Sequence, residues 1–502
     1  MVKKLKKIFL LLMLFAALFL VSFFLFGFVN AATYYVSSNG SSTGSGSINS
    51  PWDIQTALNN AVAGDEVLIL PGYYSVTGLS SRKSGNLNNY IVFRGSDSNN
   101  KPVLNNSAER TLLRIYGNYV MFKDIILINT FRTYNIGIWN NNAPGGRGII
   151  LDGIESEWNY PFQAYTVDNI FASNFQDGII RNSKIKGAGH NGINIQVSQS
   201  FTQNSNNFII ENNEIYGQQW HHAINIFPNV VWENPNFIDG FVIRNNYIHD
   251  LGNYQSAIFT RYVRNFKIYN NLLVNVGSGL TIASGDATPS DVYDAQGASF
   301  DNNIYIGAGG GRAVNNGVAN NLRIRNNIFY GFMYQNNIIS FSENYVPGIQ
   351  GYPVQGHILN NNIYYSNTGL MTITWGANTY SDFDLYKSNS GQDSDSYNQN
   401  PLFVNPALDW HLLSDSIGIN TGQELSYFST DYVGVSRPQG AAWDIGAFEY
   451  VSGSTQYHPA DLNQNGCVEL GEISVYVGLW LNNQGVSLSE ASSAVSIWLG
   501  GC

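Results

Sequence analysis

The segment IRNNYIHD (residues 243–250) decides the fold, because its asparagine pair between apolar residues returns throughout the middle of the chain. The equivalent first asparagines are Asn182, Asn212, Asn245, Asn270, Asn302, Asn326 and Asn361. The six intervals from 182 to 361 average about 30 residues, a fixed period within the range of repeat architectures. Apolar residues within each unit alternate as in short β-strands and show no helical pattern.

Asparagine suits a sharp corner between strands because it tolerates the left-handed backbone conformation. Stacked asparagines can also form a hydrogen-bonded ladder from coil to coil. MFKDIIL and IILDGIE extend the register to Asp124 and Asp152. The flanking Ile and Val residues are expected to point inward, where successive coils bury them against each other.

These repeats resemble the right-handed parallel β-helix of the pectate-lyase-like superfamily. SPWDIQTALNNAVAGDEVLILPGYY (residues 50–74) predicts an N-terminal cap, with Ser50 as helix N-cap and Pro51 at the first helical position. Residues 399–450 resemble the C-terminal end of exported β-helix proteins. The resemblance implies an all-β solenoid over residues 32–451 and leaves the function open, because fold does not imply function.

The N-terminus has the features of a signal peptide. MVKKLKK precedes an apolar run from Ile8 to Phe28, and VNAA follows, with cleavage expected after Ala31. The alternative is an uncleaved membrane anchor, because the run is long enough to span a bilayer. We therefore expect a secreted or cell-surface protein that contacts a membrane only if residues 1–31 are retained.

Composition favours a sugar partner over nucleic acid. The first 31 residues hold four lysines and no acid, so the mature chain carries a net charge of −14. This balance disfavours nucleic acid. Charged residues make up only 12%, and Tyr, Asn, Gly and Ser are abundant. An uncharged polar and aromatic surface suits a polysaccharide or surface glycan, although the same composition is typical of turns.

A short linker (452–456) precedes a predicted calcium module at residues 457–502. DLNQNGCVELGE (461–472) matches the EF-hand loop, with an oxygen ligand expected at each coordinating position and Gly466 at the turn. The expected ligands are Asp461, Asn463, Asn465, the backbone carbonyl of Cys467, Glu469 and Glu472. The Cys467 side chain is free to pair with Cys502 in an oxidising compartment.

The module also resembles a duplicated dockerin-type calcium domain, since Glu472 to Trp480 is repeated by Glu490 to Trp498. NNQGVSLSE, however, lacks the acidic loop of a second site, so one Ca²⁺ is expected. The resemblance implies a cohesin-like partner or a cell-surface scaffold. A module that only anchors or caps the chain is the alternative.

Four of the seven histidines, His190, His221, His222 and His249, fall within sixty residues and are expected to cluster in space. Aligning GHNGINIQ (189–196) with WHHAINIF (220–227) places His190 over His221 and Asn194 over Asn225. The next rung, YQSAIFTR (254–261), adds outward positions at Gln255, Phe259 and Arg261. Trp158 and Trp220 are nearby candidates for sugar platforms.

This patch suits a polysaccharide lyase or a C5-epimerase of uronic acids. His221 or His222 is expected to act as base and His190 as its partner or acid. Arg261 would stabilise the developing charge, and Asn194, Asn225 and Gln255 would bind substrate. A glycoside hydrolase is less favoured, because no carboxyl pair matches on adjacent rungs. A non-catalytic adhesin that binds glycans is the rival from another class.

Overall fold

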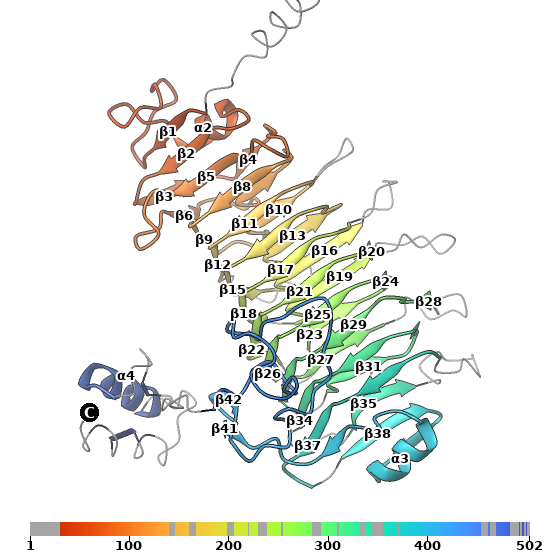
Figure 1. Ribbon diagram of the computed structural model, residues 1–502. Helices are drawn as coiled ribbons and strands as arrows, with labels where there is room; N and C mark the ends of the chain where they lie inside the picture. The colour runs from red at the N-terminus through yellow and green to blue at the C-terminus, as the bar shows by residue number, and fades with distance from the viewer. Residues whose placement is uncertain are drawn as a thin grey trace, which may run out of the picture.

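The chain forms an elongated stack of parallel coils (Figure 1). The computed structural model describes residues 31–139, 146–159, 167–197, 205–218, 220–228, 238–252, 255–283, 293–308, 311–331, 337–342, 355–369, 371–452, 460–461 and 468–481, with residues 491, 494, 495 and 498. Three twelve-stranded sheets run along the stack, and each coil gives one strand to each sheet in turn. The predicted all-β parallel β-helix is confirmed.

We call the three sheets I, II and III in chain order. Sheet I contains β1 (Thr33–Val36), β2 (Glu66–Ile69), β5 (Ile91–Gly95), β8 (Val120–Lys123), β11 (Ile150–Asp152), β14 (Ile179–Arg181), β17 (Ile209–Glu211), β21 (Val242–Arg244), β25 (Lys267–Tyr269), β29 (Ser299–Asp301), β33 (Arg323–Arg325) and β36 (Ile358–Asn360). Sheet II contains β3 (Tyr73–Val76), β6 (Val103–Asn106), β9 (Ile126–Asn129), β12 (Glu155–Trp158), β15 (Lys184–Ala188), β18 (Glu214–Gln218), β22 (Tyr247–His249), β26 (Leu272–Val276), β30 (Ile304–Gly307), β34 (Ile328–Gly331), β37 (Ile363–Ser366) and β40 (Tyr397–Asn398).

Sheet III contains β4 (Leu79–Ser81), β7 (Leu113–Ile115), β10 (Ile136–Ile138), β13 (Ile170–Ser173), β16 (Ile193–Val197), β19 (Ile224–Pro228), β23 (Ser256–Thr260), β27 (Ser278–Ile282), β31 (Val314–Asn316), β35 (Asn337–Ser342), β38 (Thr372–Gly376) and the antiparallel β39 (Asn378–Tyr380). Three short pairs lie outside these sheets: β20 (Ile238–Asp239) with β24 (Val263–Arg264), β28 (Tyr293–Asp294) with β32 (Ala319–Asn320), and β41 (Phe403–Asn405) with β42 (Asp409–Leu412).

Columns of identical apolar residues fill the interior of the stack. Ile170, Ile193, Ile224 and Ile258 are paired rung by rung in sheet III, and all four are fully buried. Their neighbours along each strand point outward, since successive strand residues face opposite sides. The buried residues of successive coils therefore form one continuous hydrophobic core along the stack.

The two members of each asparagine pair have different roles. The first adopts the left-handed conformation between sheets I and II, with φ between 50° and 57° for Asn182, Asn212, Asn245, Asn270, Asn302, Asn326 and Asn361. Asp124 shares it, with φ 53°, but Asp152 does not. Gly153 (φ 65°) is the left-handed corner residue of this coil. Asp152 pairs with Lys123 and Arg181 and is therefore still the last residue of its strand. Extending the register to Asp152 was therefore wrong by one residue.

The second asparagine forms the ladder. Within it each Nδ2 donates to the Oδ1 of the next rung at 2.9–3.1 Å, through Asn213, Asn246, Asn271, Asn303, Asn327 and Asn362. The ladder ends where Asn362 donates to buried Asp393 at 3.1 Å. Buried amides are thereby satisfied along the stack, as their burial requires.

An N-terminal helix caps the first coils, as predicted. It is α2 (Ile54–Asn60), and its N-cap is Asp53, whose side chain accepts a hydrogen bond from the Thr56 backbone at 2.8 Å. Ser50 and Pro51 were the wrong cap residues. Ser50 forms a bridge with Ser47, and Trp52 pairs with Val36, so the chain is still extended there.

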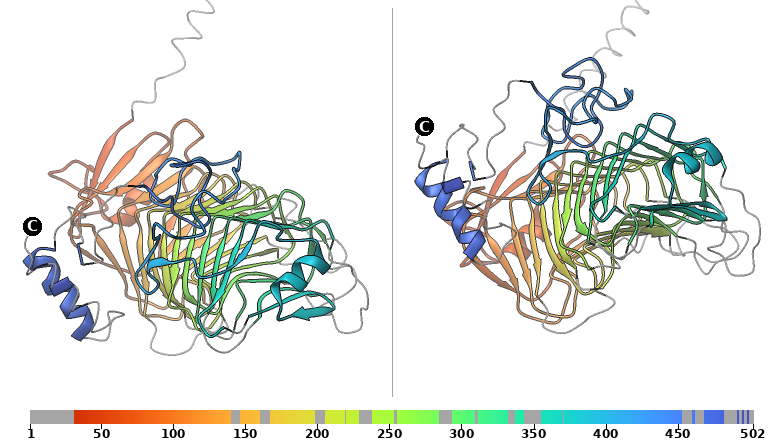
Figure 2. Two further views of the ribbon diagram at one scale, coloured as in Figure 1. Left: turned by 60° about the horizontal axis from the view of Figure 1, so that its bottom comes forward. Right: turned by 90° about the horizontal axis from the view of Figure 1, so that it is seen from below.

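After α3 (Phe383–Ser390), residues 403–450 return along the solenoid, and we call them the return segment (Figure 2). Its apolar residues pack on the outer face of sheet II, where Trp410, Ile445 and Phe448 cover the late coils. Corner asparagines of the late coils donate to its backbone, among them Asn302 to Gly446 at 3.0 Å. A buried Arg437–Glu449 ion pair at 2.6 Å holds its own fold together.

The C-terminal residues include α4 (Leu470–Leu481), which packs with Ala460, Val468, Ala491 and Ala494. The predicted signal peptide lies outside the described residues, apart from Ala31 at its end. Across the described ranges, no helix has the length and apolar character needed to cross a membrane.

Candidate functional site

The outer face of sheet III carries the predicted patch. Asn194 pairs with Asn225 and then Phe259, and Gln196 pairs with Phe227, so the register expected from the sequence is confirmed. The His190 and His221 rings precede these strands at equivalent positions, and their centroids lie 4.2 Å apart. The two imidazoles therefore lie in one column and in contact, but their planes are tilted by 55° rather than stacked.

A buried carboxylate that the sequence did not single out orients His190. Asp168 is 2% exposed, and its Oδ1 lies 2.8 Å from Nδ1 of His190. Asp168 also accepts hydrogen bonds from the Asn191 backbone and side chain and, at 2.7 Å, from the Asn194 side chain. Asp168 therefore fixes the His190 ring through Nδ1, and we assign a hydrogen to Nδ1, so that Nε2 is the nitrogen left to exchange a proton with a ligand.

His221 and His222 differ sharply in environment. His221 is exposed, and partial burial, followed by repulsion from His190, lowers its pKa below the usual value. Burial, followed by repulsion from His221, His190 and Arg261, lowers the pKa of His222 to about 3. Nδ1 of His222 accepts a hydrogen bond from the Ser256 backbone at 3.2 Å. His222 is therefore a neutral packing residue whose basic nitrogen is already engaged, and His221 is the better base.

The amide side chains expected to bind substrate, those of Asn194, Asn225 and Gln255, are more buried than the sequence suggested. Asn194 and Asn225 are 1% and 5% exposed, and Nδ2 of Asn225 donates to Asn194 at 3.4 Å. Asn194 is committed to Asp168, whereas Oδ1 of Asn225 has no partner among the described residues. Gln255 is buried and accepts from the Gly252 backbone at 2.9 Å. The assignment of Gln255 to substrate binding was therefore wrong, because its side chain closes a local turn.

Arg261 lies over two aromatic rings of the same face. Its guanidinium carbon is 5.3 Å from the Phe259 ring and 5.9 Å from the Phe227 ring, and His222 stacks on Phe259 at 4.2 Å. Nε of Arg261 is buried and unpartnered among the described residues. Arg261, the predicted charge stabiliser, is thus held beside the histidines by the Phe259 and Phe227 rings. Its Nε keeps the capacity to donate a hydrogen bond.

An aromatic floor, also missed from the sequence, lies beside Asp168. Tyr134, Trp139 and Phe171 are half-buried, with ring centroids 5.3–5.7 Å apart. Burial, followed by the charge of Asp168, raises the pKa of Tyr134 to about 12, so this phenol stays neutral. Extending the alignment one coil earlier, to VDNIFAS (167–173), would have placed Asp168 level with Asn191 and Phe171 level with Asn194.

Three other expectations have different outcomes. Trp220 is 41% exposed beside His221, and its role as a platform stays a prediction. Trp158 is only 2% exposed, and its Nε1 donates to the Phe131 and Thr133 carbonyls, so its role as a platform is corrected. His249 lies on sheet II between Glu214 and Asp250, so the four histidines do not form one cluster.

Three arginines on or beside sheet III keep a hydrogen-bond donor without a partner among the described residues. Arg114 lies in the column of Asn194, and the Nε atoms of Arg114, Arg261 and Arg312 are all buried without a partner among the described residues. On sheet I, by contrast, Arg181–Asp152, Arg244–Glu211 and Arg325–Asp301 pair at 3.0, 2.6 and 2.8 Å. The Nε of Arg181 has no partner in the described part of the chain either, so the contrast lies in the ion pairs alone, and the three arginines of sheet III keep donors for a ligand.

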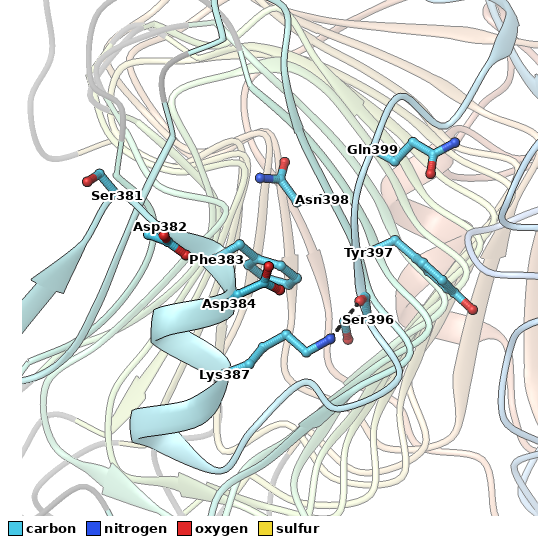
Figure 3. Close-up of a pocket in the computed structure, with 9 residues that line it drawn as sticks. All are labelled: Ser381, Asp382, Phe383, Asp384, Lys387, Ser396, Tyr397, Asn398 and Gln399. Atoms are coloured by element: carbon cyan, nitrogen blue, oxygen red, sulfur yellow. Dashed lines mark hydrogen bonds between the residues drawn. The ribbon is translucent and has the colours of Figure 1, made fainter.

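A separate pocket of about 540 Å³ lies at the last coil, between α3 and β40 (Figure 3). It is lined by Ser381, Asp382, Phe383, Asp384, Lys387, Ser396, Tyr397, Asn398 and Gln399. Asp382 caps α3 through the Leu385 backbone, and Lys387 bonds to the Ser396 carbonyl at 3.4 Å. These contacts assign structural roles to two of its charged residues, and it contains none of the histidines.

The calcium loop falls only partly within the described residues. Asn463, Asn465, Cys467 and Cys502 lie outside them, so neither the ligand set nor the disulfide is tested. Asp461 and Glu472, at the two ends of the loop, are buried, and Glu472 accepts from the Glu469 backbone at 3.0 Å. Within the described ranges, no group of three or more metal-binding side chains is found. The calcium site stays a prediction.

No family model and no curated protein sequence matches this chain. Solved structures of similar shape include the pectate lyase Pel9A, at 16% identity over 84% of this chain and 97% of the other, with a TM-score of 0.41. XylC in complex with xylose is 10% identical over 84% and 98%, with a TM-score of 0.48. The GH136 lacto-N-biosidase from Eubacterium ramulus is 11% identical over 74% and 67%, with a TM-score of 0.39. Likeness at this level concerns the fold and carries no argument about activity.

Proposed function

We propose that this protein cleaves a uronic-acid-containing polysaccharide by β-elimination on the outer face of sheet III. One observation carries the proposal: His190, oriented by buried Asp168, lies 4.2 Å from exposed His221, ring to ring. Arg261, whose Nε has no partner among the described residues, is on the same face. A base, a polarised partner and a cation together are what proton removal next to a carboxylate requires.

His221 is the base in this proposal, because its lowered pKa keeps the imidazole neutral at neutral pH. It takes the C5 proton, the released electron pair forms the C4–C5 double bond, and the bond from C4 to the glycosidic oxygen breaks. His190 is the acid in this step: with Nδ1 held by Asp168, its protonated ring donates the Nε2 proton to that oxygen. Arg261 offsets the charge that develops on the substrate carboxylate.

The arrangement favours elimination over C5 epimerisation. The His190 and His221 rings are neighbours in one column, so both approach a bound sugar from the same side. Removal of the proton and departure of the leaving group on one side is a syn elimination. Epimerisation needs a proton delivered to the opposite side of C5, and neither imidazole is placed to do that.

The test is the ultraviolet absorbance of the unsaturated product during incubation with a panel of uronic-acid polysaccharides. Wild-type chain should produce a rise that His221→Ala and Asp168→Asn abolish. His249→Ala is the matched control, because it removes a histidine from sheet II. No rise with any polymer, or a rise that His221→Ala leaves intact, contradicts the proposal.

A non-catalytic glycan-binding protein is the second candidate, and the aromatic floor favours it. Tyr134, Trp139 and Phe171 offer half-buried rings on which a sugar can stack, as in many ligand sites. Retained glycan binding without any product would select it. Hydrolysis is weaker, because Asp168 is the one carboxylate among the described residues of this patch and hydrolases ordinarily need two.

We also propose that the protein is exported and binds one Ca²⁺ in the loop at 461–472. Support comes from the loop sequence and from the burial of Asp461 and Glu472, since carboxylates at both ends suit a hard cation. Calcium would order the loop against α4 and anchor the chain to a surface or scaffold. Calcium titration followed by tryptophan fluorescence tests this, with Asp461→Ala expected to remove the response.

A further inference from the structure

An apolar stripe runs along the outer face of sheet I. It consists of Val92, Met121, Ile150, Ile179, Ile209 and Val242, which pair rung by rung in adjacent strands. Each residue is half-buried, and its inward neighbour, such as Leu151 or Ile180, is fully buried. Six rungs at the usual strand spacing make the stripe about 24 Å long.

On sheet II, the outward positions that the return segment covers are apolar, and so are the half-buried Val103 and Ile126 of the early coils. In the middle coils the outward positions are Glu155, Lys184 and Glu214. They become Leu272, Ile304, Ile328 and Ile363 where the return segment lies over them, and there they are 0–4% exposed. The stripe on sheet I matches the covered positions of sheet II in composition, although the residues of sheet I under the return segment are polar.

The return segment does not supply that cover. It reaches sheet I at the later coils, where Tyr427 lies 4.9 Å from the Lys267 ammonium and Phe428 stacks on Tyr269 at 4.4 Å (Figure 1). The stripe ends one rung earlier, at Val242, and its column continues as Lys267, Ser299 and Arg323. The change from apolar to polar residues therefore coincides with the start of the return segment.

We propose that the stripe is the interface for a second copy of this chain, packed face to face with the two solenoids antiparallel. A two-fold axis lying across the stripe between Ile150 and Ile179 places each residue opposite an apolar partner: Ile150 opposite Ile179, Met121 opposite Ile209, and Val92 opposite Val242. Such an isologous contact closes on itself, as homodimer interfaces do.

The charged column beside the stripe is complementary under the same axis. It contains Lys123, Asp152, Arg181 and Glu211 in successive rungs. The two-fold places Lys123 opposite Glu211 and Asp152 opposite Arg181. Asp152 already pairs with Arg181, and Glu211 with Arg244, within one chain, so the contact would extend these pairs into a network across the axis and give Lys123 an acidic neighbour. Arg94 meets Arg244 at the ends, but each already holds a glutamate of its own chain. This charge pattern is the reason to choose a second copy over an unrelated partner.

The size of the surface predicts a weak dimer. The stripe and its charged column span three residues of each central strand and cover roughly 24 by 10 Å, so they bury roughly 500 Å² in total, the size of a weak and transient contact. Dimerisation should therefore depend on concentration.

Sedimentation velocity of the purified chain over a concentration series is the test. Wild type should shift from monomer to dimer, and Ile150→Lys should remain monomeric at every concentration. Ile358→Lys is the matched control, because Ile358 is 47% exposed in the same column but lies outside the stripe. It should still dimerise, and unchanged far-ultraviolet circular dichroism shows that both variants are folded.

Charge reversal tests the antiparallel arrangement. Lys123→Glu should weaken the dimer at least tenfold, and addition of Glu211→Lys should restore it. A chain that stays monomeric at all concentrations overturns the proposal, as does a dimer that Ile150→Lys leaves unchanged. If the double variant dimerises as weakly as Lys123→Glu alone, the antiparallel pairing is overturned.

Discussion

Replacement of Asn303 by Leu tests the asparagine ladder. The Asn303 side chain is fully buried and makes four hydrogen bonds. Its Oδ1 accepts from the Asn271 backbone and side chain, both at 2.9 Å. Its Nδ2 donates to the Ile268 carbonyl and to Asn327, both at 3.1 Å. Leu has a similar volume and forms none of these bonds.

The expected loss follows from what each partner retains. The Asn271 side chain keeps its bonds to the Ile243 and Tyr269 carbonyls, and Oδ1 of Asn327 keeps its bond from the Asn303 backbone. The Asn271 backbone N–H loses its partner, which costs about 1–3 kcal/mol when buried. With about 1 kcal/mol for each remaining bond, and some gain from the apolar side chain, the free energy of unfolding should fall by about 4 kcal/mol.

Urea unfolding followed by far-ultraviolet circular dichroism measures this loss. Asn315→Leu is the matched control, because Asn315 points outward from sheet III and is half-buried. That variant should change the free energy of unfolding by less than about 0.5 kcal/mol. If Asn303→Leu unfolds within about 1 kcal/mol of wild type, the ladder is not a major source of stability and the reasoning is refuted.

Three further predictions concern the site on sheet III. Asp168→Asn should lower the turnover number at least about 10²-fold, because His190 loses its orienting carboxylate, and should also lower the unfolding midpoint, because buried Asp168 accepts from Asn191 and Asn194 as well. Trp139→Ala should weaken glycan binding about tenfold, measured by calorimetry, without moving the pH profile of turnover, because it removes only a stacking surface. His222 has a folded pKa of about 3, below its unfolded value, so stability is lost as pH falls from 6.5 towards 3. The loss at pH 5 should be about 2 kcal/mol, and His222→Gln should flatten that dependence in urea midpoints measured between pH 7 and 5.

The sequence was enough to predict which site residues of neighbouring coils lie next to each other. Alignment of the IleAsnIle segments placed His190 over His221 and Asn194 over Asn225, because the two-residue period of a strand fixes which side chains share a face. Asp168 was missed because it precedes a strand whose motif, VDNIFAS, lacks the asparagine pattern used for the alignment.

The sequence by itself determined the parallel coils, the left-handed asparagine corners and the columns of sheet III, because period, alternation and backbone preference are local properties. Tertiary structure alone decided that Asp168 meets His190, that Trp158 is buried, and that His249 faces another sheet. It also decided where the return segment covers sheet II. These outcomes depend on how irregular loops bring residues that are distant in the sequence into contact, and no local sequence pattern encodes such contacts.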